Sequence, residues 1–107
     1  MNTLMNTHDV YVQYEASEPF KGRAPAVLRA YVKVPRAKIE EYRRQENDYA
    51  SDDNDIAQTL SDSLAFNLLG QLHGYWISCL DTLPVDLQER APAFKEKDGM
   101  AFWLKRD

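Results

Sequence analysis

Alternating apolar and polar residues in the first third of the chain predict two β-strands. Residues 8–15 place valine or tyrosine at every second position, from Val10 to Tyr14. Residues 26–34 show the clearest alternation, with alanine, leucine or valine on one face. A two-residue period is typical of strands that bury one face. We expect the two strands to pair antiparallel across a loop at residues 16–25.

The next segments show helical spacing of their apolar residues. Pro35 ends the second strand, and residues 36–49 carry a narrow apolar stripe that is typical of a surface helix. Residues 55–80 are amphipathic at first and then apolar nearly all round, so we predict one long central helix. A helix of that length is unusual in a small domain, and Gly70 or Gly74 is where we expect it to bend or break.

The C-terminal part of the chain predicts a β-hairpin. Residues 94–97 and 100–105 flank Asp98-Gly99, a pair that supplies the positive φ angles of a tight type I′ turn. Residues 85–90, between two prolines, favour a short helical turn.

The element order is therefore strand, strand, helix, helix, strand, strand. This order predicts an α+β fold, with an antiparallel sheet of three to four strands packed against a long central helix and a shorter surface helix. We expect one domain over residues 1–107, with residues 1–7 loose.

Composition excludes several protein classes. The single cysteine, Cys79, cannot form an intrachain disulfide, and the N-terminus lacks the pattern of a signal peptide. The most apolar stretch is too short to span a bilayer, so we expect a cytoplasmic protein without a membrane partner. The net charge of −4 argues against direct binding to nucleic acid, because phosphates repel an acidic surface.

The acidic charge is concentrated in residues 46–62, which contain six Asp or Glu and no Lys or Arg. Next to tyrosines, such a run is a candidate surface for a basic protein partner. The alternative is that the aspartates cap and solvate the start of the long helix. The run lacks the glycine and glutamate that an EF-hand loop needs, so we predict no metal site. The candidate partner-binding residues are Tyr42, Asp48, Tyr49, Asp52, Asp53 and Asp55.

A second group of candidate residues surrounds Gly70 and Gly74, which are four positions apart. In a helix this spacing allows a close approach by a neighbouring element or by a second copy of the chain. On such a helix the side chains of His73 and Cys79 would point in different directions, so we expect no catalytic Cys–His pair. We expect Cys79 to lie in the core. The candidate dimer or packing contacts are Gly70, His73, Gly74, Tyr75 and Trp76.

Function is predicted from size, acidity and the lack of a catalytic or cofactor motif. We expect a non-enzymatic accessory or inhibitor protein that binds another protein, of the anti-defence type that mobile elements carry, with no cofactor and no catalytic residue. One alternative is a small enzyme or ligand-binding domain with a pocket between the sheet and the long helix. Another is a structural homodimer subunit. A further expected binding face is the outer side of the sheet, with Arg29, Tyr31, Lys33 and Trp103.

Overall fold

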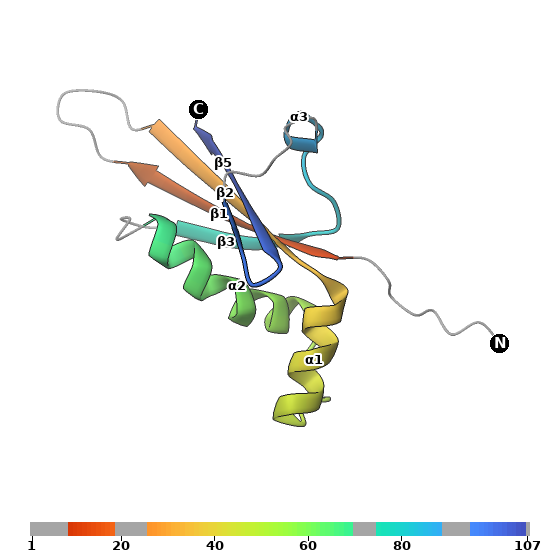
Figure 1. Cartoon of the computed structure of the whole chain (residues 1–107). Helices are drawn as coiled ribbons and strands as arrows, with labels where there is room; N and C mark the ends of the chain where they lie inside the picture. Colours follow the sequence, from red (N-terminus) through yellow and green to blue (C-terminus); the bar gives the residue numbers. More distant parts are fainter. Residues whose placement is uncertain (1–8, 19–25, 70–74, 89–94, 107) are drawn as a thin grey trace.

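A five-stranded antiparallel sheet organises the chain, with strand order β3-β1-β2-β5-β4. The computed structural model describes residues 9–18, 26–69, 75–88 and 95–106. One long helix lies across one face of the sheet, and a short helix lies on the other side (Figure 1). The elements are β1 (Val10–Glu18), β2 (Ala26–Val34), α1 (Arg36–Glu46), α2 (Asp53–Leu69), β3 (Tyr75–Leu80), α3 (Val85–Gln88), β4 (Lys95–Lys97) and β5 (Met100–Arg106).

The predicted pairing of the first two strands is confirmed. β1 and β2 are antiparallel from the Val10–Val34 pair to the Glu18–Ala26 pair. β2 has the predicted bounds, whereas β1 extends to Glu18, into the predicted loop. The ladder of main-chain hydrogen bonds carries the strand past the end of the apolar alternation, because pairing with β2 satisfies backbone groups whatever the side chains are.

The predicted long helix is wrong in its second half. Helix α2 ends at Leu69, and residues 75–80 form strand β3, which pairs antiparallel with β1. This segment contains two aromatic residues and an isoleucine, which favour a strand, but a short apolar run is equally compatible with a buried helix. Pairing with β1, which lies far earlier in the chain, selects the strand over the helix. The predicted break at Gly70 or Gly74 lies outside the described residues.

The C-terminal hairpin is confirmed, and the sheet has five strands where three to four were predicted, because β3 adds one. β4 and β5 pair across Asp98 and Gly99, whose φ angles are 54° and 79°. The predicted short helical turn is present as α3. Helix α1 ends three residues earlier than predicted, because Asn47 adopts a left-handed conformation and its N–H bonds to the Arg43 carbonyl.

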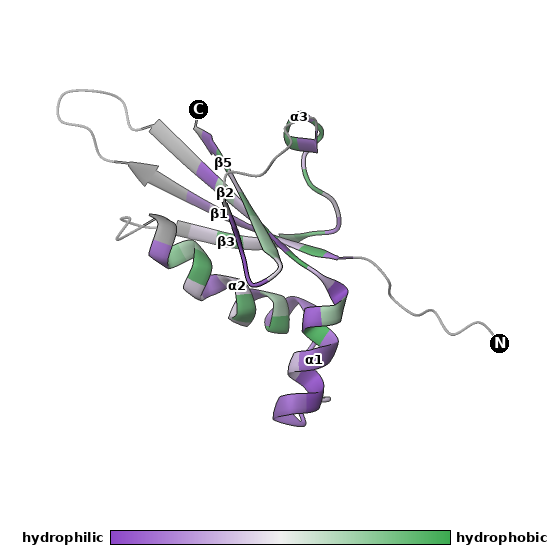
Figure 2. Cartoon of the chain, in the orientation of Figure 1, coloured by the Kyte–Doolittle hydropathy of each residue, from purple (hydrophilic) through white to green (hydrophobic). Residues whose placement is uncertain are grey.

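The main core lies between α2 and one face of the sheet. Its buried side chains include Val12, Val32, Ile56 and Leu64. Tyr14 is also buried here, and its hydroxyl donates to Asp62 Oδ1 at 2.6 Å and lies 2.7 Å from Ser61 Oγ. Helix α1 is hydrophilic over most of its length (Figure 2), as expected for a surface helix. Its one buried residue is Ile39.

The outer face of the sheet is partly covered by residues 81–88. Leu83 and Leu87 pack with Tyr31, and Tyr11, Leu80 and Trp103 lie around this second cluster. Tyr31 is 3% exposed, so the expectation that it belongs to a solvent-exposed face is wrong. Strand alternation assigns Tyr31 to this face, but the segment that covers it is decided by tertiary packing.

No helix among the described residues is both long and apolar enough to cross a membrane.

Candidate functional site

Residues 47–55, which we call the acidic tip, comprise the connection between α1 and α2 and the first three residues of α2. Two arginines on α1 hold the tip from inside. Arg43 donates to the carbonyls of Asp48 (3.2 Å) and Ser51 (2.8 Å) and to Asp53 Oδ1 (2.6 Å). Arg36 Nη1 lies 2.7 Å from the other oxygen of the Asp53 carboxylate. One aspartate, the first residue of α2, therefore links that helix to two arginines of α1.

Two further aspartates are used inside the tip. Asp48 accepts hydrogen bonds from the N–H groups of Ala50 and Ser51 and from the Ser51 hydroxyl. Asp52 Oδ1 accepts the N–H of Asp55 at 2.8 Å, which caps the start of α2. The capping role that the sequence suggested for this run is therefore present at Asp52.

The electrostatics of the tip follow from these contacts. Hydrogen bonds from Ser51 lower the pKa of Asp48, and the hydrogen bond from Arg43 is the main cause of the lowered pKa of Asp53. Both carboxylates are therefore ionised at neutral pH and remain bound to their partners. The tip is an acidic turn with a fixed backbone.

Three candidate residues of the tip are exposed, including Asp52, whose carboxylate also caps α2. Tyr49 is 69% exposed, and Asp52 and Asp55 are exposed beside it in sequence. Tyr42, by contrast, is partly buried against the main core. The six residues singled out in the sequence thus divide into an internal set (Tyr42, Asp48 and Asp53) and an outward set (Tyr49, Asp52 and Asp55).

Metal-ligating residues do not converge in the described part of the chain. Among these residues, no group of three or more His, Cys, Asp or Glu is arranged to hold a metal ion. Cys79 is partly buried against the main core, and its thiol lies 3.7 Å from the Asn54 carbonyl. Burial raises the pKa of Cys79, so the thiol is protonated at neutral pH.

The candidate dimer residues are only partly described. Gly70, His73 and Gly74 lie outside the described residues. Tyr75 and Trp76 belong to β3, a strand at one edge of the sheet, and not to a helix as predicted. Trp76 is 73% exposed.

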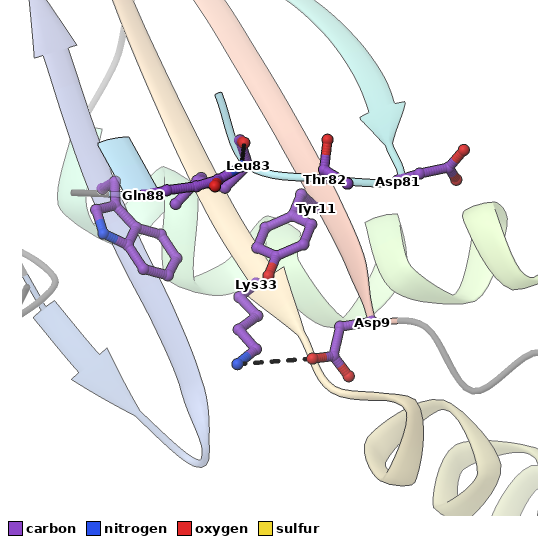
Figure 3. Close-up of a pocket in the computed structure, with 8 residues that line it drawn as sticks. Asp9, Tyr11, Lys33, Asp81, Thr82, Leu83 and Gln88 are labelled. Carbon is purple, nitrogen blue, oxygen red and sulfur yellow. Dashed lines mark hydrogen bonds and ion pairs between the residues drawn. The ribbon is translucent and has the colours of Figure 1, made fainter. Parts of the chain in front are cut away.

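Sequence reasoning missed a hollow on the outer face of the sheet. It measures about 460 Å³, and Tyr11 and Trp103 form part of its wall, with their ring centroids 6.4 Å apart. Lys33 Nζ pairs with Asp9 Oδ2 at 3.6 Å along the same wall (Figure 3). Among the described residues, the hollow is lined by Asp9, Tyr11, Lys33, Asp81, Thr82, Leu83, Gln88 and Trp103.

The hollow lies on the face opposite α2, whereas the sequence suggested a pocket between the sheet and the long helix. That inner space is occupied by buried side chains such as Val12, Ile56 and Leu64. Alternation in the strands places Tyr11 and Lys33 on one face, but the residues that close the hollow come from the segment after β3. No local pattern signals that this segment returns over the sheet.

No family model, curated protein or solved structure matches this chain. Any function assigned to the chain therefore rests on its own geometry.

Proposed function

We propose that this chain is a non-enzymatic accessory or inhibitor protein that binds another protein through the acidic tip. One observation carries the proposal: Tyr49 is 69% exposed on a turn whose backbone is held by Arg43. A tyrosine offers a large contact area at low cost in conformational entropy. A turn that is already ordered loses little further freedom on binding, which favours affinity.

The charge of the tip indicates the partner. Asp52 and Asp55 are exposed near Tyr49 in sequence, and an acidic surface attracts a basic one and speeds encounter. We therefore propose a partner protein with a lysine- or arginine-rich surface. A nucleic-acid-binding site on another protein has this character, and an acidic protein that occupies it would act as an inhibitor. An anti-defence protein of a mobile element would work in this way.

The tip is tested by capture of a partner from cells that produce the natural chain. We expect Tyr49→Ala to weaken binding to the captured protein about tenfold or more, as for a central aromatic contact.

A double variant, Asp52→Asn with Asp55→Asn, removes two charges from the tip, while the amide oxygen introduced at position 52 can still accept the capping hydrogen bond. This double variant should slow association and reduce its dependence on salt.

A matched control removes two charges elsewhere. Glu96→Gln with Asp98→Asn lies on the exposed β4–β5 hairpin, and asparagine tolerates the positive φ at residue 98. This control should bind like the natural chain. Mass spectrometry identifies the captured protein, and surface plasmon resonance measures each variant. If the natural chain, Tyr49→Ala, the Asp52/Asp55 double variant and the control all bind equally, a role for the acidic tip is contradicted.

The hollow on the outer face supports a second candidate function, a ligand-binding domain. Its volume falls in the range of small-molecule sites, and two aromatic rings in its wall suit a flat ligand.

Tryptophan fluorescence tests this function in a Trp76→Phe variant, in which Trp103 is the sole tryptophan. We expect a flat aromatic ligand from a compound panel to change the Trp103 fluorescence in a saturable way. Tyr11→Ala should weaken the binding of that ligand about tenfold. If no compound in the panel changes the fluorescence in a saturable way, this function is contradicted.

A further inference from the structure

The two edges of the sheet have opposite chemical character. β4 is three residues long with the sequence Lys-Glu-Lys, and a short charged strand discourages pairing with another chain. β3 is six residues long, Tyr-Trp-Ile-Ser-Cys-Leu, with no charge and no proline. Among the described residues no strand pairs with β3 on the side away from β1. An edge of this kind presents unpaired backbone groups to another strand.

The side chains of β3 are also incompletely covered. Trp76 is 73% exposed, and Ile77 and Cys79 are only partly buried against the main core. On the neighbouring strand β1, Val12 and Tyr14 are buried. On the inner face, exposure therefore increases from β1 to β3, as it would at an edge that another strand completes.

We propose that two copies of this chain associate through β3, antiparallel, about a two-fold axis at Ser78. This edge adjoins the acidic tip, because Cys79 Sγ lies 3.7 Å from the Asn54 carbonyl, but the proposal does not depend on the function proposed for the tip. Each Trp76 then lies opposite Leu80 of the partner subunit, and each Ile77 lies opposite Cys79 of the partner subunit. Leu80 belongs to the cluster on the outer face, so Trp76 would extend that cluster across the interface.

The register follows from the two faces of the sheet. A two-fold axis normal to the sheet places outer-face residues opposite outer-face residues, so a shift by one position is excluded. A centre at Ile77 would place Trp76 opposite Ser78, whereas a centre at Ser78 places Trp76 opposite an apolar residue. The second arrangement covers the exposed indole of Trp76 with an apolar side chain, so it is favoured.

The choice of a second copy as the partner follows from charge and closure. β3 carries no charge, so pairing with itself places no like charges opposite one another. The contact uses the same patch on both copies, so it closes at two. The charged β4 edge remains at both ends of the joined sheet, where it opposes further growth into fibres.

Sedimentation velocity across the micromolar range tests the proposal on the full chain. We expect a dimer for the natural sequence. Ser78→Lys would place two ammonium groups at the axis and should weaken dimerisation about tenfold or more. Trp76→Glu should do the same without disturbing the fold of one copy, because this side chain is 73% exposed. Ser63→Lys, at an exposed position on α2, is the matched control and should remain dimeric.

Disulfide trapping tests the register. In a Cys79→Ser background, Ser78→Cys is expected to form an interchain disulfide on mild oxidation, and Ser63→Cys is not. Tyr49→Ala should leave the dimer unchanged, which distinguishes the dimer contact from the partner binding proposed for the acidic tip. A natural chain that sediments as a monomer throughout, a dimer that withstands both β3 variants, or equal trapping at positions 63 and 78 would each overturn the proposal.

Discussion

Replacing Tyr14 by alanine is expected to lower the free energy of unfolding by about 3–5 kcal/mol, the range for large aromatic residues in cores. Tyr14 is buried, and its ring packs edge-on against Phe66 with centroids 5.9 Å apart. The substitution leaves a cavity between β1 and α2. It also removes the hydroxyl that donates to Asp62. Urea denaturation followed by circular dichroism measures the loss.

Tyr14→Phe separates the two causes. It keeps the ring and removes only the hydroxyl, so we expect a loss of about 1 kcal/mol, the usual net contribution of one hydrogen bond, since Ser61 Oγ still donates to the Gln58 carbonyl. Burial is the main cause of the raised pKa of Tyr14, so the hydroxyl is protonated and donates at neutral pH. A Tyr14→Ala variant within about 1 kcal/mol of the natural chain would show that this contact between β1 and α2 is not a principal part of the core.

Replacing Asp53 by asparagine is expected to lower the free energy of unfolding by about 1–2 kcal/mol, a value reduced for partial exposure of the carboxylate. Asp53 is the shared partner of Arg36 and Arg43, at 2.7 Å and 2.6 Å. Asparagine keeps the size of the side chain but loses the charge, so α1 and α2 lose their main ionic contact. Asp55→Asn is the matched control, because this neighbouring carboxylate is exposed.

The loss of stability caused by Asp53→Asn should depend on pH. The folded chain lowers the pKa of this carboxyl from its ordinary value of 3.8, chiefly through the hydrogen bond from Arg43. Ionised Asp53 therefore stabilises the fold above pH 3.8, and the stabilisation disappears as the pH falls through the lower folded pKa. The stability difference between the natural chain and Asp53→Asn should shrink over that interval. A difference that stays constant with pH, or equal stability of the two Asn variants, would contradict the ionic link.

Local patterns determined a large part of the fold. The alternation in residues 26–34 defined a strand with its correct bounds, because a strand that buries one face must repeat every two residues. Asp98-Gly99 determined the hairpin, because these residues adopt positive φ readily. The aspartates indicated a helix start within two residues of the observed one, residue 55 against Asp53, since carboxylates cap the N-terminus of a helix.

The identity of β3 was decided by tertiary structure. A short apolar segment satisfies helix and strand patterns alike, and its pairing with β1 selected the strand. The same pairing placed Trp76 at an open edge of the sheet rather than on the face of a central helix. The candidate dimer contact therefore changed from one between helices to one between strands.

The sequence by itself determined that the acidic residues gather between two helices, because their positions along the chain are local facts. Only the tertiary structure decided which of them face outward. Arg36 and Arg43 lie on α1, and their reach to Asp53 depends on how α1 and α2 meet. The hollow on the outer face likewise depends on residues 81–88 returning over the sheet. Both arrangements depend on contacts between segments that are separate in the chain, and local periodicity carries no information about such contacts.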